Sequence, residues 1–243
     1  MLFSYFIKNR AKSFDKKIEY YEDKVNHDTI CNKLDIPHPK RYFVLDNIDD
    51  IRKIKLPDNC VIKYNNLASA KGIIFRKNDI FTNNFDLNQV IYFLKNNNKQ
   101  NTSCQISIKN IKQKVIIDEL LIGNTNSDFI QDIKLYAFKG TCKYILITEH
   151  FNKQGKSRHY DINFNRVVLK KYDNDDFYHK KPKHLNEIIN YGNKIAKELF
   201  PDTFVRIDFY STTKGPMFGE ITFNPSGGNG FTKNADKILG KLL

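Results

Sequence analysis

The sequence is poor in cysteine, methionine and tryptophan and has no long apolar run. Its 243 residues include no tryptophan, two methionines and four cysteines, which are Cys31, Cys60, Cys104 and Cys142. The cysteines are far apart and form no CxxC pair, which argues against a zinc site or a disulfide framework. No apolar run reaches the roughly 18 residues of a membrane-spanning helix. We therefore expect a cytoplasmic protein with reduced thiols, at most peripheral to a membrane-linked pathway.

Acidic residues are also scarce relative to basic ones. The chain has 27 Asp and Glu against 40 Lys and Arg, a formal net charge of +13. Its apolar fraction of 40% is ordinary for a globular protein with one large domain or two small ones. The excess of positive charge predicts an anionic partner, which could be nucleic acid, a membrane surface, a nucleotide or an acidic glycan.

Local patterns predict helices alternating with strands. Polar and apolar spacing predicts helices at 15–34, 87–98 and 183–200. Runs of β-branched and aromatic residues predict strands at 42–45, 60–64 and 115–122, a hairpin over 133–150 that turns at Lys139 and Gly140, and two more strands within 205–228. This order predicts an α+β fold with mainly antiparallel sheets.

The stretch "VRIDFYSTTKGPMFGEITFNPSGG" carries the strongest chemical signal. Arg206 and Asp208 are two apart on one strand, as are Glu220 and Thr222 on the next, so each pair shares a face. If "STTKGP" pairs the strands, both carboxylates converge beside the arginine and suit Mg²⁺ and phosphate. The alternative is a solvated strand face with a surface ion pair.

Two further segments contain charged residues next to apolar strands. Lys63 precedes the small-residue loop "NNLASAK", where a phosphate could approach, although an exposed lysine before a turn is equally compatible. Asp118 and Glu119 end the apolar run "VIIDELLIG". Because a buried carboxylate needs a partner, we expect an ion pair at the core edge there.

These segments, read in order, resemble an ATP-grasp enzyme. They are "EDK" before "LDIPHPK", "VIK" before the small-residue loop, "IIDELL", "QDIKLYAFKG", and "VRIDFY" with "FGEITFNPSGG". The subgroup they resemble is the TupA-like ATP-grasp proteins, which are associated with teichuronopeptide and other bacterial surface-polysaccharide pathways. The resemblance spans about residues 14–240.

The resemblance implies roles for residues that bind ATP. Lys24 and Lys63 correspond to the lysines that hold the nucleotide phosphates, and Ser69 lies in the phosphate loop. Glu119 and Leu121 match the hinge where backbone groups and a carboxylate read the adenine.

It also implies the residues that bind the ribose and metal and that assist transfer. Asp132 corresponds to the ribose-binding acid, and Lys134 follows it on the same strand face. Arg206 matches the arginine that stabilises the transferred phosphate, and Lys134 is assigned to catalysis with it. The implied Mg²⁺ ligands are Asp208, Glu220 and one or both of Thr222 and Asn224.

The expected organisation is two α/β lobes with mainly antiparallel sheets that grip the nucleotide. We assign 1–60 to a short N-terminal helical segment and connection, 61–118 to the small lobe with the phosphate loop, and 119–243 to the large lobe with the hinge and metal site. A full N-terminal domain of the kind that precedes the ATP-binding lobes is expected to be missing or supplied by a partner.

The resemblance implies an ATP-dependent carboxylate-amine ligase that forms an amide through an acyl phosphate. The expected acceptor is an anionic small molecule or glycan, a uronic acid or other carboxylate of a bacterial capsule or cell-wall polysaccharide, with an amine donor. One alternative is a kinase that phosphorylates a sugar hydroxyl. Another is a basic nucleic-acid-binding module, but no basic helix or aromatic platform is found, so nucleic acid is not expected.

Overall fold

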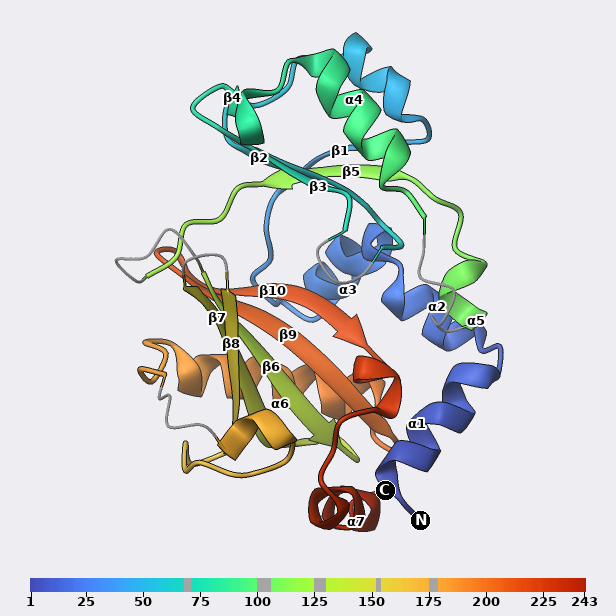
Figure 1. Cartoon of the computed structure of the whole chain (residues 1–243), viewed down its shortest axis with the longest axis vertical. Coiled ribbons are helices and arrows are strands. Elements are labelled where there is room, and N and C mark those ends of the chain that lie inside the picture. Colours follow the sequence, from blue (N-terminus) through green and yellow to red (C-terminus); the bar gives the residue numbers. More distant parts are fainter. Residues whose placement is uncertain (68–70, 100–105, 125–129, 152–153, 175–178) are drawn as a thin grey trace. The chain divides into compact units, whose positions relative to one another are not determined.

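The computed structural model describes the whole chain except residues 68–70, 100–105, 125–129, 152–153 and 175–178 (Figure 1). The chain divides into two compact units. Unit 1 comprises Met1–Phe14, Ile30–His38 and Ile122–Leu243, and unit 2 comprises Asp15–Thr29 and Pro39–Leu121. The first 60 residues, expected as one segment, are therefore shared between the units.

Unit 1 is built on a five-stranded sheet in which every neighbouring pair is antiparallel. The strand order is β10-β9-β6-β7-β8, with β6 at Gln131–Phe138, β7 at Thr141–Phe151, β8 at Gln154–Asp161, β9 at Phe204–Thr212 and β10 at Gly215–Thr222. The predicted hairpin over 133–150 is confirmed. It turns at Lys139 and Gly140, which both have positive φ.

Helices cover the two faces of this sheet differently. Helix α6 (Leu185–Leu199) packs on one face, where Gly192 approaches Leu135 so closely that a Cβ would overlap its side chain (Figure 1). On the other face, α1 (Phe3–Lys12) and α7 (Lys233–Lys241) cover one end of the sheet through an aromatic core that includes Phe3 and Phe204. The rest of that second face carries polar side chains.

Unit 2 is built on a second five-stranded antiparallel sheet. Its order is β1-β5-β2-β3-β4, with β1 at Arg41–Leu45, β2 at Cys60–Tyr64, β3 at Ile73–Lys77, β4 at Ile80–Phe81 and β5 at Val115–Glu119. Helix α4 (Leu87–Asn96), whose first turn has a capping box between Asp86 and Gln89, packs its apolar side on one face of this sheet. The predicted strands at 42–45 and 60–64 and the helix at 87–98 are thus confirmed within a few residues.

The remaining elements of unit 2 are short. They are α2 (Lys16–Glu22), η1 (Lys24–Asn26), η2 (Ile48–Lys53), η3 (Thr82–Asn84) and α5 (Ile106–Lys109), while α3 (His27–Lys33) runs across the boundary into unit 1. The prediction of one helix over 15–34 was wrong. The helix ends at Asp23, whose extended backbone frees its side chain to accept hydrogen bonds from the Val25 N–H and from Asn65.

The α+β fold with antiparallel sheets is as predicted, and Cys31, Cys60 and Cys142 are buried. No helix within the described ranges is long and apolar enough to cross a membrane. In unit 1, the short helices η4 (Lys171–Asn174) and η5 (Pro225–Gly228) complete the fold next to the sheet's polar face.

Candidate functional site

Arg206 is the centre of an ionic cluster on the polar face of the unit 1 sheet. Its Nε donates to Asp208 Oδ1 at 2.7 Å, and one terminal nitrogen donates to Asp208 Oδ2 at 2.6 Å. The same nitrogen reaches Glu220 Oε1 and Thr222 Oγ1, each at 3.0 Å. Asp208 is almost fully buried and Arg206 largely so. The four residues therefore meet, and the face that holds them is largely buried where the alternative expected a solvated one.

Lys134 and Asp132 of β6 extend the cluster. Lys134 Nζ is 3.2 Å from Asp208 Oδ2 and also ion-pairs with Asp132 Oδ2. Burial alone would lower the pKa of Lys134, but Asp208 and Asp132 outweigh it and raise that pKa. Burial, reinforced by Asp208, raises the pKa of Asp132 despite Lys134. Among the described residues, Asp132 Oδ1 is buried and has no hydrogen-bond partner.

A β-bulge brings Glu220 and Thr222 to this face. Near the hairpin turn Phe218 is opposite Phe209, but beyond Gly219 the register shifts, so Glu220 is opposite Asp208 and Thr222 opposite Arg206. Without the shift Glu220 would be opposite Ile207, on the apolar face, because directly paired residues point the same way. A Cβ on Gly219 would lie 3.1 Å from both the Asp208 carbonyl oxygen and the Tyr210 ring.

The structure separates the two candidates for the third metal position. Thr222 lies in the cluster, and its hydroxyl is 3.3 Å from Glu220 Oε1. Asn224 lies past the end of β10, and its Oδ1 accepts from Arg10 Nε at 3.1 Å. Arg10 also donates to the carbonyl oxygens of Phe204 and Phe223, so Asn224 belongs to the contact between α1 and the sheet.

The donor set of the cluster fits a magnesium ion. Three carboxylates face two cations, so the cluster has one negative charge in excess. Asp208, Glu220 and Thr222 supply hard oxygens, and Asp132 Oδ1 is buried without a hydrogen-bond partner among the described residues. In the part of the chain that is described, no group of three or more His, Cys, Asp or Glu side chains is placed to hold a metal ion. Mg²⁺ does not require one, since it commonly keeps water and phosphate ligands.

In unit 2, Lys63 belongs to a smaller ionic group. Lys63 Nζ is 3.1 Å from Asp118 Oδ2, and Arg41 Nε is 2.7 Å from Asp118 Oδ1. Burial would raise the pKa of Asp118, but Lys63 and Arg41 outweigh it and lower the pKa. The ion pair expected at the end of β5 is therefore present. It occupies the face of β2 opposite the α4 core, since Lys63 alternates with Ile62 and Tyr64.

The other predicted nucleotide residues are distributed over unit 2. Lys24 Nζ donates to the Leu67 carbonyl at 2.9 Å, which holds it against the start of the phosphate loop. Glu119 exchanges hydrogen bonds with the Lys40 backbone. Leu121 is the last residue of unit 2, at the proposed hinge. Ser69 lies outside the described residues.

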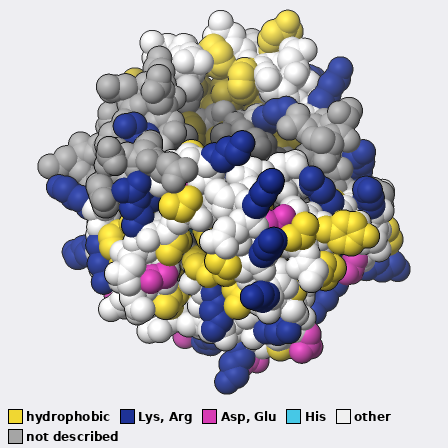
Figure 2. Space-filling view, turned by 60° about the horizontal axis from the view of Figure 1, so that its bottom comes forward, with side chains coloured by type: hydrophobic (Ala, Val, Ile, Leu, Met, Phe, Trp, Pro, Cys, Tyr) yellow, Lys and Arg dark blue, Asp and Glu magenta, His cyan; other side chains and the backbone are white. Residues whose placement is uncertain are grey.

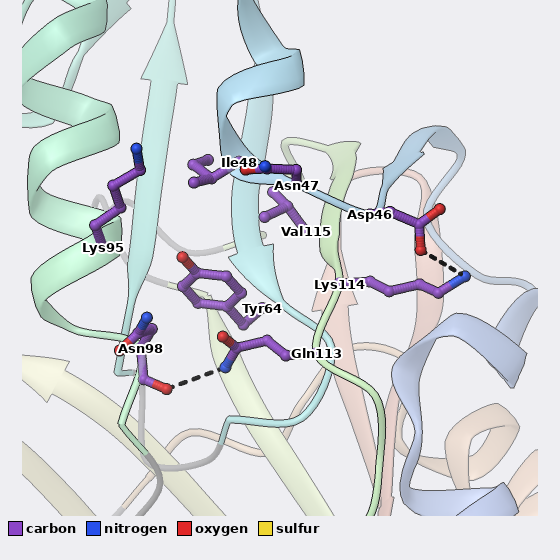
Figure 3. A pocket seen from close by; sticks show the side chains of 9 residues that line it. All are labelled: Asp46, Asn47, Ile48, Tyr64, Lys95, Asn98, Gln113, Lys114 and Val115. Carbon is purple, nitrogen blue, oxygen red and sulfur yellow. Dashed lines mark hydrogen bonds and ion pairs between the residues drawn. The ribbon is translucent and has the colours of Figure 1, made fainter.

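Unit 2 also contains a cavity of about 260 Å³ on the α4 side of its sheet (Figure 3). Amide side chains of Asn47, Asn98 and Gln113 line it with Tyr64, and Gln113 donates to the Asn98 carbonyl at 3.0 Å. Lys114 points outward to Asp46. The cavity is therefore separated by the sheet from Lys63 and is not part of the predicted phosphate site.

Several residues at the polar face of unit 1 escaped the sequence analysis. Tyr210 follows Asp208 at the same two-residue spacing along β9, so the alternation of a strand would have placed it on this face. Burial, and then the charge of Asp132, raises the pKa of Tyr210. His159 and Asp173 form a fully buried pair, 2.9 Å between Nδ1 and Oδ2. Lys170 is nearly buried beside the turn that follows β10. No sequence spacing links these last three to Arg206.

The two antiparallel sheets with an Arg-Asp-Glu cluster belong to a protein of the ATP-grasp class. The chain is a member of the TupA-like ATP-grasp family, which it matches over residues 7–243. No curated protein matches the chain.

Solved structures with a similar fold are remote in sequence. The D-alanine–D-alanine ligase from Bacillus anthracis has a TM-score of 0.51 and 15% identity, over 92% of this chain and 63% of that one. Phosphoribosylamine–glycine ligase from Thermotoga maritima has 0.52 and 16%, over 88% and 51%. L-amino acid ligase from Bacillus licheniformis has 0.52 and 11%, over 87% and 42%. The chain thus spans 42% to 63% of the length of these proteins, and the likeness concerns the fold.

Proposed function

We propose that the chain is an ATP- and Mg²⁺-dependent carboxylate-amine ligase acting on a uronic acid or other carboxylate of a bacterial capsule or cell-wall polysaccharide. Membership of the TupA-like ATP-grasp family supports ATP as the cosubstrate. The similar structures named above are all those of ligases, which supports amide formation. The observation that carries the proposal is the buried cluster of Arg206, Lys134, Asp208 and Glu220 on one sheet face.

The proposed reaction has two steps that balance without a further reactant. A carboxylate oxygen of the acceptor attacks the γ-phosphorus of ATP, and ADP leaves. The amine nitrogen then attacks the acyl carbon, phosphate leaves, and the nitrogen loses a proton. The chain's task is to position the reacting groups and to stabilise charge on the phosphoryl oxygens.

The residues of the cluster divide this task. Asp208, Glu220 and Thr222 would hold Mg²⁺, which when bound neutralises charge on the nucleotide phosphates. Arg206 is fixed by two carboxylates and a hydroxyl, so its guanidinium is preorganised toward a transferred phosphoryl group. Lys134 adds a second cation that Asp208 and Asp132 keep protonated. In unit 2, Lys63 and Lys24 would contact the nucleotide phosphates, and the backbone near Glu119 and Leu121 the adenine.

The surface charge supports an acidic acceptor. The net charge is +13, and Lys and Arg side chains are spread over the face shown in Figure 2 with fewer Asp and Glu among them. Such a field attracts polyanions from a distance and raises their encounter rate. A uronic acid polymer combines that charge with the carboxylate that the reaction consumes.

The test is incubation with ATP, Mg²⁺, candidate uronic acids and amines, followed by mass spectrometry. The ligase predicts an amide product with one ADP and one free phosphate for each amide. A phosphorylated sugar without free phosphate would instead identify a kinase and overturn the ligase. Omission of the amine is the control, because the amide must then disappear.

Nucleotide binding is tested separately from the acceptor. A ligand that binds only the folded state stabilises it by mass action, so millimolar MgATP should raise the melting temperature. An unchanged melting temperature together with no heat of binding by calorimetry would remove ATP from the proposal.

A further inference from the structure

Lys170 is held rigidly beside the polar face of unit 1. Its backbone N–H donates to Asp173 Oδ2 at 2.6 Å, and its carbonyl accepts from the Asp173 N–H at 3.0 Å. It also forms an isolated bridge with Phe231. Asp173 is itself fixed by the ring and backbone of the buried His159. The position of Lys170 is therefore determined by several contacts and not by its own flexible side chain.

The Lys170 ammonium is buried without a counter-ion. The residue is only 6% exposed, and Nζ donates to Ser226 Oγ at 2.8 Å while lying 4.8 Å from the centre of the Phe231 ring. No carboxylate of the described residues is within ion-pair distance of it. Burial, and then the charge of Arg206, lowers the pKa of Lys170 to about 8 despite the opposing effect of Asp173. Lysine is almost never buried unpaired, because the loss of hydration is costly.

Ser226, the hydrogen-bond partner of Lys170, lies in the turn that follows β10. Ser226 and Gly227 are exposed, and both have positive φ. Gly230 also lies beside Lys170, since a Cβ there would be 3.7–4.0 Å from the lysine side chain. The ammonium is therefore hydrogen-bonded to a residue of an exposed turn, although the lysine itself is buried. A small anion at this turn would replace the missing counter-ion and offset the repulsion from Arg206.

We propose that Lys170 and Ser226 bind an oxyanion of the reacting substrates, either the transferred phosphoryl group or the acceptor carboxylate. The inference rests on the proposed ligase function for the identity of those substrates. The site itself rests on the buried cation without a counter-ion and on the exposed turn that it contacts. Lys170 is then a binding residue that supplements Arg206, with Ser226 as a neutral hydrogen-bonding partner.

The first experiment measures binding of inorganic phosphate to the parent and to Lys170→Met, by calorimetry and by thermal shift. Methionine keeps the length and apolar stem of lysine but removes the charge. We expect at least about a tenfold weaker phosphate affinity in the variant, because a charge-assisted hydrogen bond is lost. Without phosphate, the variant should melt at or above the parent temperature because an unpaired buried charge is gone. The matched control is Lys181→Met at an exposed lysine of the same unit, which should bind phosphate like the parent.

Phosphate that fails to bind the parent, or that binds Lys170→Met within about twofold of the parent, overturns the proposal. If Lys170→Met does not fold, Ser226→Ala at the exposed turn takes its place, with a smaller expected loss of about threefold to tenfold. An unchanged phosphate affinity in that variant has the same meaning.

Two more titrations, with MgADP and with glucuronate, separate the source of the oxyanion. A loss in Lys170→Met confined to MgADP assigns the phosphoryl group, and a loss confined to glucuronate assigns the acceptor carboxylate. The site is overturned if Lys170→Met and Ser226→Ala bind phosphate, MgADP and glucuronate with the same affinities as the parent. Failure of the parent to bind any adenine nucleotide, with phosphate binding still dependent on Lys170, would defeat the ligase proposal and leave the oxyanion site standing.

Discussion

The two sheets of the protein carry different ionic groups on equivalent-looking polar faces. In unit 2 one buried carboxylate, Asp118, is shared by Lys63 and Arg41, and both of its oxygens are paired. In unit 1, three carboxylates surround Arg206 and Lys134, and Asp132 Oδ1 is buried without a partner. In the unit 2 group every carboxylate oxygen of Asp118 has a cationic partner, whereas the unit 1 cluster has more carboxylates than cations.

This difference indicates how each face would engage a nucleotide. A lysine whose charge is already compensated must share its partner to bind phosphate, so Lys63 would contribute a modest amount of binding energy. A cluster with an uncompensated carboxylate gains when a cation arrives, so the unit 1 face is suited to a metal. Chemistry should therefore depend more on unit 1, and ground-state binding more on unit 2.

The largest effect is expected from Asp208→Asn and Glu220→Gln. Each keeps the side-chain shape but removes a charge that would hold Mg²⁺ against the phosphates. We expect ATP consumption in the presence of acceptor to fall by about a hundredfold or more, with circular dichroism unchanged. Asp202→Asn, at an exposed carboxylate of unit 1, is the control. Folded variants that keep more than about a tenth of parental turnover, a loss under ~1.4 kcal/mol, would contradict the metal assignment.

A smaller effect, on binding, is expected from Lys63→Met in unit 2. Loss of one charge-assisted phosphate contact weakens MgATP affinity by about 1.5 kcal/mol, the lower end of the usual range, because Lys63 is also paired with Asp118. Asp118 remains paired with Arg41, so the fold should persist. Calorimetry with Lys53→Met, an exposed lysine of the same unit, as the reference checks this. An affinity within about twofold of the parent would exclude Lys63 from the phosphate site.

Gly219→Ala should have an intermediate effect on turnover. The added Cβ would meet the Asp208 carbonyl oxygen and the Tyr210 ring at 3.1 Å, so the bulge must shift and misalign Glu220. We expect turnover to fall by about tenfold, since small misplacements of positioning groups are costly. Gly215→Ala, at the turn of the same hairpin, is the control. Its positive φ is strained for alanine, but nothing lies within 4 Å of the added Cβ, so it tests whether backbone strain in the hairpin alone lowers turnover. Equal losses in both variants would remove the special role of the bulge.

The smallest effect concerns the exposed charges that lie outside both clusters. If long-range attraction recruits an anionic acceptor, its apparent Michaelis constant should rise a few-fold with added salt, since charges are screened beyond about 8 Å at physiological ionic strength. The buried clusters should be less sensitive, so the Michaelis constant for ATP should change less. A salt-independent value for the acceptor would argue against steering by the net charge of +13.

Much of the local structure was accessible from the residue pattern. The strands at 60–64 and 205–210, the helix at 183–200 and the turn at Gly140 follow from apolar periodicity and glycine conformation, which act over a few residues. The helix expected over 15–34 was wrong because the Asp23 side chain bonds to Asn65, a partner 42 residues away that no local pattern contains.

The sequence by itself determined which residue types could form the unit 1 cluster, because the spacing of Arg206 from Asp208 and of Glu220 from Thr222 places each pair on one strand face. Only the tertiary structure decided that the two pairs meet. The bulge at Gly219 sets the register between strands, and register depends on backbone pairing across the hairpin. Likewise Arg10 of α1 binds Asn224, and the unpaired Lys170 lies beside Ser226. Such contacts join residues tens to hundreds of positions apart. They depend on packing and electrostatics through space, so no local or periodic pattern in the sequence reveals them.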